Sequence, residues 1–262
     1  RLRTNNSAMS ELAAAELFSV RNRVVVVTGG ASGIGLMMAR GFAANGAVVY
    51  VVSRKPAAAV VDELRSLPGA TRVEALACDL SSVEGIRGFV AQLRERESHV
   101  DVLVNNSGTN WSAPVDSYPE SGWDKVMALN VKTPFFLTQA MLPLLEARAS
   151  AEAPARVINV GSIDGVRPAP MDTFAYGASK AALHHLTQML ARALAPRHVT
   201  VNAIAPGPFR SRMMKVTLER LGDLVAQSTA LGRLGSDGDV AGAALWLSSA
   251  AGSYVTGAVV VV

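Results

Sequence analysis

The sequence predicts one doubly wound α/β sheet of seven parallel strands with helices on both faces. Short runs of β-branched residues alternate with longer segments of helical periodicity, which is the pattern of successive β-α-β units. The strand candidates are nearly continuous apolar runs, as expected for a parallel sheet that is buried on both faces. No internal repeat of about 20–50 residues and no low-complexity linker interrupts the alternation. The sequence therefore shows no boundary at which a second domain would begin.

We expect strands at residues 24–28, 47–52, 72–78, 100–105, 155–161, 198–204 and 258–262. Helices are expected in the intervals, at residues 33–45, 56–67, 82–97, 117–128, 131–148, 174–195 and 237–249. Residues 1–20 are predicted to be an N-terminal extension of a single domain that covers residues 21–262. Because residues 207–235 are only weakly periodic, we expect a mobile helical excursion there, on the substrate side of the domain. Since the sequence starts at Arg1 and stops inside an apolar run, we expect a fragment or a processed form.

The composition favours a globular protein of a reducing compartment. Half of the 262 residues are apolar, which is enough for a buried core, yet the longest apolar runs fall far short of the roughly 18 residues that span a bilayer. The single cysteine, Cys78, cannot form an internal disulfide, and no zinc-site spacing of Cys and His occurs. A net charge of +4, spread along the chain, argues against binding to nucleic acid or to a membrane. We therefore expect a cytoplasmic protein without a metal site, with import into an organelle as the open alternative.

A glycine-rich turn follows the first predicted strand and opens directly into a helix. Gly29 permits the tight turn, Gly33 lets the backbone approach a phosphate, and Gly35 lets helix and strand pack closely. The helix N-terminus offers unpaired N–H groups and the positive end of its dipole to a pyrophosphate. Such a turn also occurs for purely structural reasons, but its position after the first strand predicts a dinucleotide site. The contacts expected in this turn are Gly29, Ser32, Gly33, Ile34 and Gly35.

The choice of cofactor is predicted from the end of the second strand. Arg54 stands where an NAD site usually carries an acidic residue for the ribose hydroxyls. Because a planar guanidinium suits a 2′-phosphate, NADP is the preferred cofactor and NAD stays possible. In the structural alternative, Arg54 and Lys55 merely begin a solvated helix. Asp79-Leu80 and Asn105-Asn106-Ser107-Gly108 end the next two strands at the same carboxyl edge of the sheet, where ligands bind in such folds.

Tyr176 and Lys180 are the candidate reactive pair. They are four residues apart in a helical segment, which places both side chains on one helix face. A free phenol, with a pKa of about 10, is a poor acid or base at neutral pH. We therefore expect the ammonium of Lys180 to lower the pKa of Tyr176 by stabilising the phenolate. Ser162, at the end of the fifth strand, is placed to donate a hydrogen bond to a carbonyl oxygen, unless it is only a turn residue.

These motifs, with Asn130 and Pro206-Gly207, make residues 20–262 similar to the short-chain dehydrogenase/reductases. The resemblance implies a Rossmann fold, a nicotinamide cofactor, assembly as a homodimer or homotetramer, and a catalytic tetrad. In that tetrad Tyr176 would be the acid/base and Lys180 would also hold the nicotinamide ribose. Ser162 would orient the substrate oxygen, and Asn130 would anchor a proton-relay water.

The resemblance also implies cofactor contacts beyond the glycine turn. Asp79 would contact the adenine, Asn106 the adenine-side ribose, and the Pro206-Gly207 turn the carboxamide. The remaining expected contacts are Arg54, Leu80, Ser107, Gly108, Tyr176, Lys180, Phe209 and Ser211.

Residues 117–123, 155–162 and 208–213 look like the bacterial 3-oxoacyl reductases associated with rhamnolipid synthesis. This finer resemblance predicts the NADPH-dependent reduction of a small-molecule carbonyl, a 3-oxoacyl group or a similar ketone, to a secondary alcohol. The open alternatives are the NAD(P)-dependent oxidation of a sugar alcohol or a steroid, and a non-catalytic cofactor-sensing protein. A substrate linked to an acyl carrier protein or to coenzyme A would meet Arg210, Arg212 and Lys215, which otherwise belong to a solvated face.

Two further features of this region are the spacing between Ser162 and Tyr176 and a pair of histidines after Lys180. Ser162 and Tyr176 are one residue further apart than is common in the family, so the loop around Pro168 and Pro170 is expected to absorb the extra residue. His184 follows Lys180 by one helical turn, with His185 next to it. Because the tetrad needs no imidazole, we expect these two histidines to serve packing or a subunit surface.

Overall fold

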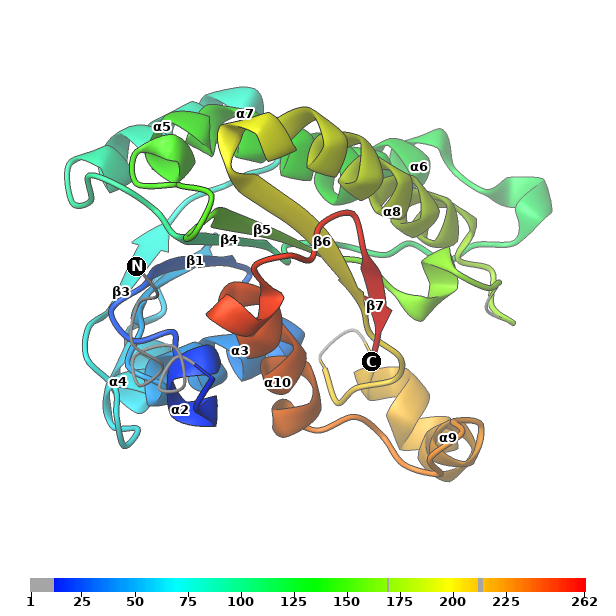
Figure 1. Ribbon diagram of the computed structural model, residues 1–262. Helices are drawn as coiled ribbons and strands as arrows, with labels where there is room; N and C mark the ends of the chain where they lie inside the picture. Colours follow the sequence, from blue (N-terminus) through cyan, green and yellow to red (C-terminus); the bar gives the residue numbers. More distant parts are fainter. Residues whose placement is uncertain (1–11, 169, 212–213) are drawn as a thin grey trace, which may run out of the picture.

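A computed structural model describes residues 12–168, 170–211 and 214–262 of the chain. The strands found there form one seven-stranded sheet of order β3-β2-β1-β4-β5-β6-β7, in which all neighbours are parallel (Figure 1). The strand order reverses between β1 and β4, and in such sheets this point opens the crevice that holds ligands. The predicted doubly wound, Rossmann-type fold is confirmed.

The strands lie close to their predicted positions because the valine-rich runs have no competing helical periodicity. They are β1 Val24–Thr28, β2 Val48–Ser53, β3 Val73–Ala77, β4 Val102–Asn105, β5 Ala155–Val160, β6 Val199–Ala205 and β7 Val259–Val261. The α-helices are α2 Ala14–Leu17, α3 Gly33–Ala44, α4 Ala58–Arg65, α5 Val83–Arg94, α6 Glu120–Met127, α7 Thr133–Glu146, α8 Phe174–Leu194, α9 Lys215–Gln227 and α10 Asp237–Ser248. None of the helices in the described ranges is both long enough and apolar enough to cross a membrane.

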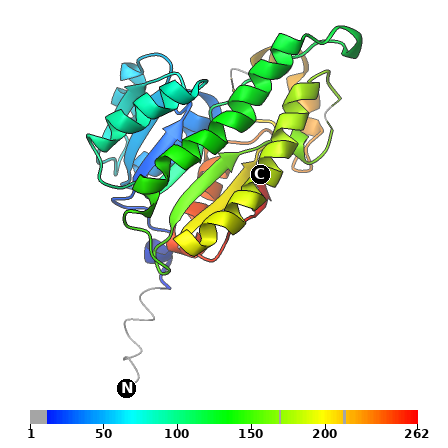
Figure 2. The ribbon, with the colours of Figure 1, turned by 90° about the horizontal axis from the view of Figure 1, so that it is seen from above.

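Two hydrophobic cores lie on the two faces of the sheet. Helices α3, α4 and α10 cover one face, and α5, α7 and α8 run across the other (Figures 1 and 2). Since side chains alternate along a strand, Val25 and Val27 of β1 enter the first core, whereas Val24 and Val26 enter the second. Each of these valines is almost completely buried. Burial on both sides explains why the strands are apolar throughout.

A π-helical turn joins α6 to α7, so the predicted separation into helices 117–128 and 131–148 is wrong. The turn covers Ala128–Lys132 and carries the chain from Glu120 to Glu146 without a break. Such turns hold one residue more than an α-helical turn and occur often at functional sites. Here the turn places Asn130 in the interior, where the residue is 1 % exposed.

Helices also occur in the excursion at residues 207–235 and in the N-terminal extension, outside the alternation of strands and helices. The excursion at residues 207–235 contains α9, whose backbone departs from helical geometry at Leu221. In the predicted N-terminal extension, residues 1–11 lie outside the described residues, and α2 follows them. Val20 is fully buried in the core that α3 and α10 cover. The mobility expected for the excursion stays a prediction.

Thr28 ties the end of β1 to the end of β4. Its hydroxyl donates to the carbonyl oxygen of Val104 over 3.1 Å and accepts from the backbone N–H groups of Asn106 (2.9 Å) and Ser107 (3.0 Å). The side-chain amide of Asn106 donates back to the carbonyl oxygen of Thr28 over 2.8 Å. This clamp holds together the two strand ends that border the crevice.

Thr28→Val keeps the side-chain shape but removes the hydroxyl. We expect a loss of about 1–3 kcal/mol in the free energy of unfolding, because the Ser107 N–H loses its acceptor and the Asn106 N–H keeps only the Val104 carbonyl oxygen. Urea unfolding with an unchanged m-value measures it. The control is Thr200→Val, because the Thr200 hydroxyl is part-buried and makes one long bond of 3.5 Å to Ala155. Equal losses in the two variants would contradict the role given to the clamp.

Candidate active site

Tyr176 and Lys180 lie side by side on α8. The ammonium nitrogen of Lys180 is 5.5 Å from the centroid of the Tyr176 ring. Lys180 is 5 % exposed and donates a hydrogen bond of 2.7 Å to the carbonyl oxygen of Val160, the last residue of β5. The spacing of four residues therefore brings the pair together as expected, and the bond to Val160 fixes the helix against the strand end.

Ser162 joins this pair from the segment after β5. It is 7 % exposed, and its hydroxyl accepts a hydrogen bond of 3.1 Å from the backbone N–H of Asp164. The phenol of Tyr176 lies close enough to this hydroxyl for their interaction to lower the pKa of Tyr176. The extra residue between Ser162 and Tyr176 therefore does not separate the two hydroxyls.

Burial, rather than the charge of Lys180, dominates the acidity of Tyr176. Desolvation raises the pKa of Tyr176 to about 12; the hydrogen bond with Ser162 lowers the pKa, and the Asp164 carboxylate raises it further. The lowered pKa expected from the sequence is wrong, because the spacing shows the neighbouring cation but not the removal of water from the phenol. At neutral pH Tyr176 is a neutral phenol that can donate a proton.

Burial shifts the pKa of Lys180 in the opposite direction to that of Tyr176. Desolvation lowers the pKa of Lys180 to about 8, and the carboxylate of Asp164 opposes this shift. Asp164 lies in the 3₁₀ turn Ile163–Gly165, directly after Ser162, and burial raises its own pKa. Sequence reasoning missed this acid, although its place two residues after Ser162 was a usable signal. The site thus holds one carboxylate that acts on both members of the reactive pair.

Asn130 is bonded through both ends of its amide. Its Oδ1 accepts from the backbone N–H of Thr109, and its Nδ2 donates to the Thr109 carbonyl oxygen and to the Ser179 hydroxyl, each over 2.9 Å. Ser179 in turn donates to the carbonyl oxygen of Tyr176 over 2.7 Å. A Cβ atom on Gly108 would lie 3.2 Å from Asn130 Oδ1 and 3.7 Å from Lys180 Nζ. Asn130 therefore lies beside the reactive pair, and the relay water assigned to it stays a prediction.

A network of buried, hydrogen-bonded side chains connects strands β4 and β5 to helices α7 and α8. Asn105 donates to Asn159 over 2.8 Å and to the Thr138 hydroxyl over 3.2 Å, and Asn159 donates to the Thr187 hydroxyl over 2.9 Å. These four side chains join β4, β5, α7 and α8. Sequence reasoning noted Asn105 but missed the other three members of this network. The available signal was an amide residue near the carboxyl end of each of two buried strands.

The glycine turn has the backbone geometry of a phosphate cradle. Gly29 and Gly33 have φ angles of +64° and +54°, a region that favours glycine. A side chain on Gly35 would collide with the amide of Asn106 and the carbonyl of Gly29. Ser32 precedes α3 without capping it through its side chain, so the first N–H groups of α3 have no partner from that hydroxyl. These features fit a pyrophosphate as the sequence predicted, with Ile34 in the first turn of α3.

The other predicted cofactor residues fall into two groups. Arg54 and Asp79 are exposed at the ends of β2 and β3, where Arg54 lies close enough for its charge to help lower the pKa of Asp79, after the hydrogen bonds from Ser81. Leu80 and Phe209, by contrast, are 4 % and 2 % exposed. Their side chains belong to the two cores, so only their backbone atoms are placed to reach a ligand.

The loop after β6 lies next to the glycine turn. A Cβ atom on Gly33 would be 3.3 Å from the Cβ of Ser211. Pro206 accepts a hydrogen bond of 2.9 Å from the N–H of Ile163, so this loop is also tied to the segment that carries Ser162. The Gly207 N–H donates to Val262 over 2.7 Å. The predicted contacts after β6 thus border both the cradle and the reactive pair.

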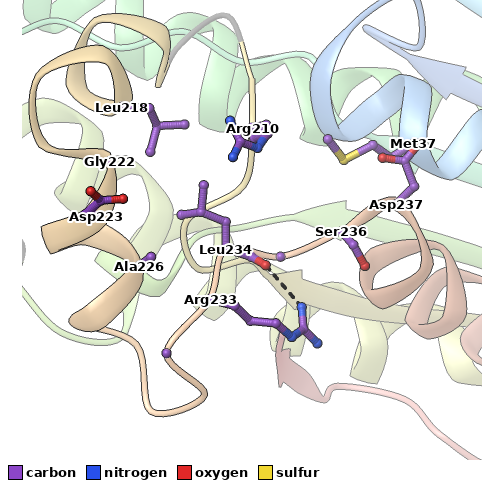
Figure 3. A pocket seen from close by; sticks show the side chains of 12 residues that line it. Met37, Arg210, Leu218, Gly222, Asp223, Ala226, Arg233, Leu234, Ser236 and Asp237 are labelled. Atoms are coloured by element: carbon purple, nitrogen blue, oxygen red, sulfur yellow. Dashed lines mark hydrogen bonds between the residues drawn. The ribbon is translucent and has the colours of Figure 1, made fainter.

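Two cavities lie between α3 and α9, and one of them reaches the glycine turn. One, of about 600 Å³, is lined by Gly33, Leu36, Met37, Arg40, Arg210, Ser211, Leu218 and Glu219. The other, of about 660 Å³, extends toward the start of α10, and Arg210 lies in it between Leu218 of α9 and Met37 of α3 (Figure 3). Neither is lined by Tyr176 or Ser162. Of the basic residues expected to meet a carrier, Arg210 lines both cavities, and Arg212 lies outside the described residues.

A parallel sheet of this order, with a glycine cradle at its crevice and a Tyr-Lys pair beside it whose lysine is buried, defines an oxidoreductase of the Rossmann type. In the described part of the chain, no three His, Cys, Asp or Glu side chains are grouped as metal ligands. The family model described as short chain dehydrogenase matches residues 23–221. The chain belongs to the short-chain dehydrogenase family.

The chain is similar to reductases and dehydrogenases of this family over nearly its whole length. It is 45 % identical to the rhamnolipids biosynthesis 3-oxoacyl-[acyl-carrier-protein] reductase of Pseudomonas aeruginosa, over 93 % of this chain and 95 % of that one. It is 34 % identical to the galactitol 2-dehydrogenase (L-tagatose-forming) of Cereibacter sphaeroides, over 94 % and 95 %. The solved Pseudomonas aeruginosa RhlG/NADP active-site complex superposes with a TM-score of 0.90 at 42 % identity, over 94 % and 96 % of the two chains.

We expect Lys180 to lose its proton far below the ordinary lysine value, at a pKa of about 8, because burial disfavours the ammonium. A ¹³C NMR titration of ε-labelled lysine measures this value, and Lys180→Arg assigns the signal by removing it. Asp164→Asn should move the midpoint lower still, because the carboxylate that opposes the shift is gone. If every lysine signal keeps its midpoint above pH 9.5, the environment described for Lys180 is incorrect.

Proposed function

We propose that the protein uses NADPH to reduce a carbonyl, a 3-oxoacyl group or a similar ketone, to a secondary alcohol. The observation that carries the proposal is the position of Tyr176, whose ring centroid lies 5.5 Å from the Lys180 ammonium nitrogen and whose phenol lies near the Ser162 hydroxyl. The 45 % identity to a 3-oxoacyl reductase supports the substrate class. Asn130, Ser162, Tyr176 and Lys180 are the proposed catalytic residues.

In this mechanism, Ser162 and Tyr176 donate hydrogen bonds to the substrate carbonyl oxygen. NADPH, held by the glycine turn, would supply the hydride that the carbonyl carbon accepts. Negative charge then develops on the oxygen, where the two fixed donors stabilise it. Although the pKa of Tyr176 is about 12, an alkoxide is a much stronger base than a phenolate, so the phenol gives up its proton. The Lys180 ammonium stabilises the phenolate that remains.

The alternative is the oxidation of a secondary alcohol, which the similarity to a galactitol dehydrogenase favours. In that direction Tyr176 acts as the base and needs its ionised form. Because burial raises its pKa to about 12, the phenolate is scarce at neutral pH. Oxidation by this site is therefore expected to need a higher pH than reduction does. A cofactor-sensing protein without turnover needs no proton donor beside Ser162, and all four tetrad positions are filled here.

The proposed cofactor is NADP, for which the chain offers a cradle and a cation. The positive φ angles of Gly29 and Gly33 and the N-terminus of α3 suit the pyrophosphate. Arg54 is exposed at the end of β2 and suits a 2′-phosphate. Similarity to a protein solved as an NADP complex supports this choice.

The remaining proposals concern the substrate, the cellular location and the oligomeric state. The substrate is a small-molecule carbonyl compound, free or linked to an acyl carrier protein or to coenzyme A, and residues 207–235 form the substrate side of one domain. The protein is proposed to work in the cytoplasm as a homodimer or homotetramer. Support for self-association comes from exposed apolar side chains on α8 and on the edge strand β7, where Met189 is 59 % and Val261 is 55 % exposed.

Tyr176→Phe should lower kcat by about 10²–10⁴-fold, because it removes the proton donor. NADPH oxidation with a panel of 3-oxoacyl thioesters and ketones measures turnover, and quenching of tryptophan fluorescence measures NADPH binding, which should stay within about twofold. Tyr118→Phe is the matched control, since the Tyr118 hydroxyl donates to Trp111 and lies outside the tetrad. Full turnover by Tyr176→Phe would end the proposal.

Arg54→Ala should weaken NADPH binding by about 10–100-fold, because a charged hydrogen bond to the 2′-phosphate contributes about 1.5–3 kcal/mol. NADH binding should not change, since NADH lacks that phosphate. Isothermal titration calorimetry with both cofactors measures the difference. Lys55→Ala removes the neighbouring exposed cation and serves as the control. Equal weakening of NADPH and NADH in Arg54→Ala would refute the role of Arg54.

A further inference from the structure

His184 is a buried imidazole that the proposed mechanism does not use. It lies on α8 one helical turn beyond Lys180 and is 8 % exposed. Its Nε2 atom is fully buried and has no hydrogen-bond partner among the described residues. Burying such a group without a partner costs stability, so its position requires an explanation.

The imidazole lies where two glycines lack side chains. A Cβ atom on Gly161 would overlap the Nε2 atom of His184. A Cβ atom on Gly165 would lie 2.9 Å from Cε1 of the same ring and 2.6 Å from the carbonyl carbon of Lys180. Neither glycine is among those with a positive φ angle, so the backbone conformation does not require glycine at either place. Glycine is required at both places because α8 approaches them closely.

These two glycines flank the residue that must meet Tyr176. Gly161 immediately precedes Ser162, and Gly165 ends the 3₁₀ turn that follows it. The His184 ring therefore fills the space between this segment and α8, on the helix that carries Tyr176 and Lys180. The ring therefore packs against the residues on either side of Ser162.

The surroundings keep this imidazole neutral. Burial lowers the pKa of His184, the charge of Lys180 lowers it further, and a backbone hydrogen bond with Gly165 acts in the opposite direction. Lys180 comes from the same helix, and Asp164, on the 3₁₀ turn, faces Lys180. A protonated ring would place a second buried cation one turn from Lys180.

We propose that His184 is a positioning residue, whose imidazole sets Ser162 against Tyr176 by filling the space over Gly161 and Gly165. The proposal rests on the function assigned above to Ser162. Its protonation in acid would loosen the contact between α8 and the Ser162 segment.

A double-mutant cycle tests the steric part. In the otherwise unchanged protein, Gly161→Ala should lower kcat by about 10-fold or more, since shifts of about 1 Å at a catalytic group cost up to about 10²-fold. His184→Ala should also lower kcat. In the His184→Ala background, the added methyl of Gly161→Ala has room and should cause no further loss. Thermal unfolding should show the same non-additivity.

The pH profile tests the charge. The wild-type kcat should fall in acid as His184 protonates, below the ordinary histidine value of 6.5. His184→Gln stays neutral at every pH, keeps a polar side chain, and should lose that acid limb. His185→Gln is the matched control, because His185 is the adjacent histidine and is exposed. It should keep the wild-type profile.

The outcomes separate this inference from the function on which it rests. A wild-type protein without turnover would remove both. If the wild type turns over substrate, two results would overturn only the positioning role. One is that Gly161→Ala leaves kcat unchanged, and the other is that Gly161→Ala lowers kcat equally in the wild-type and His184→Ala backgrounds. An acid limb retained in His184→Gln would do the same. A non-additive cycle together with a lost acid limb would support it.

Discussion

The close contact between helix α8 and the end of strand β5 is the constraint on which the site depends. Three contacts maintain it: Lys180 donates to Val160 over 2.7 Å, Asn159 donates to Thr187 over 2.9 Å, and the His184 ring lies against Gly161. Each contact joins one residue at the strand end to one on the helix. Together they set the distance between Ser162 and Tyr176, which come from these two elements.

The same contact determines the acid–base properties of the site by removing water. Tyr176 and Lys180 both lose hydration, and each is driven toward its neutral form, the phenol upward in pKa and the ammonium downward. Asp164 adds a negative charge that favours the protonated form of both. A site with these properties keeps Tyr176 protonated until a strong base such as an alkoxide forms beside it.

Much of this could be predicted from the sequence because it depends on local patterns. The apolar runs identify the strands, the glycines after β1 identify the cradle, and the spacing of Tyr176 and Lys180 identifies one helix face. The pKa of Tyr176 could not be predicted, because it depends on how much water the folded chain excludes. The burial of Phe209 and the partners of Asn105 depend in the same way on segments distant in the sequence.

The π-helical turn at Ala128–Lys132 constrains the length of the chain at this point. It holds one residue more than an α-helix of the same span. Deleting that residue would restore the regular helix and rotate all the side chains of α7 by about 100° relative to α6. The apolar stripe of α7 would leave the sheet, and Thr138 would lose Asn105. Natural variants and engineered versions of this chain should therefore tolerate substitutions in this turn, except at Asn130, far better than a change in its length.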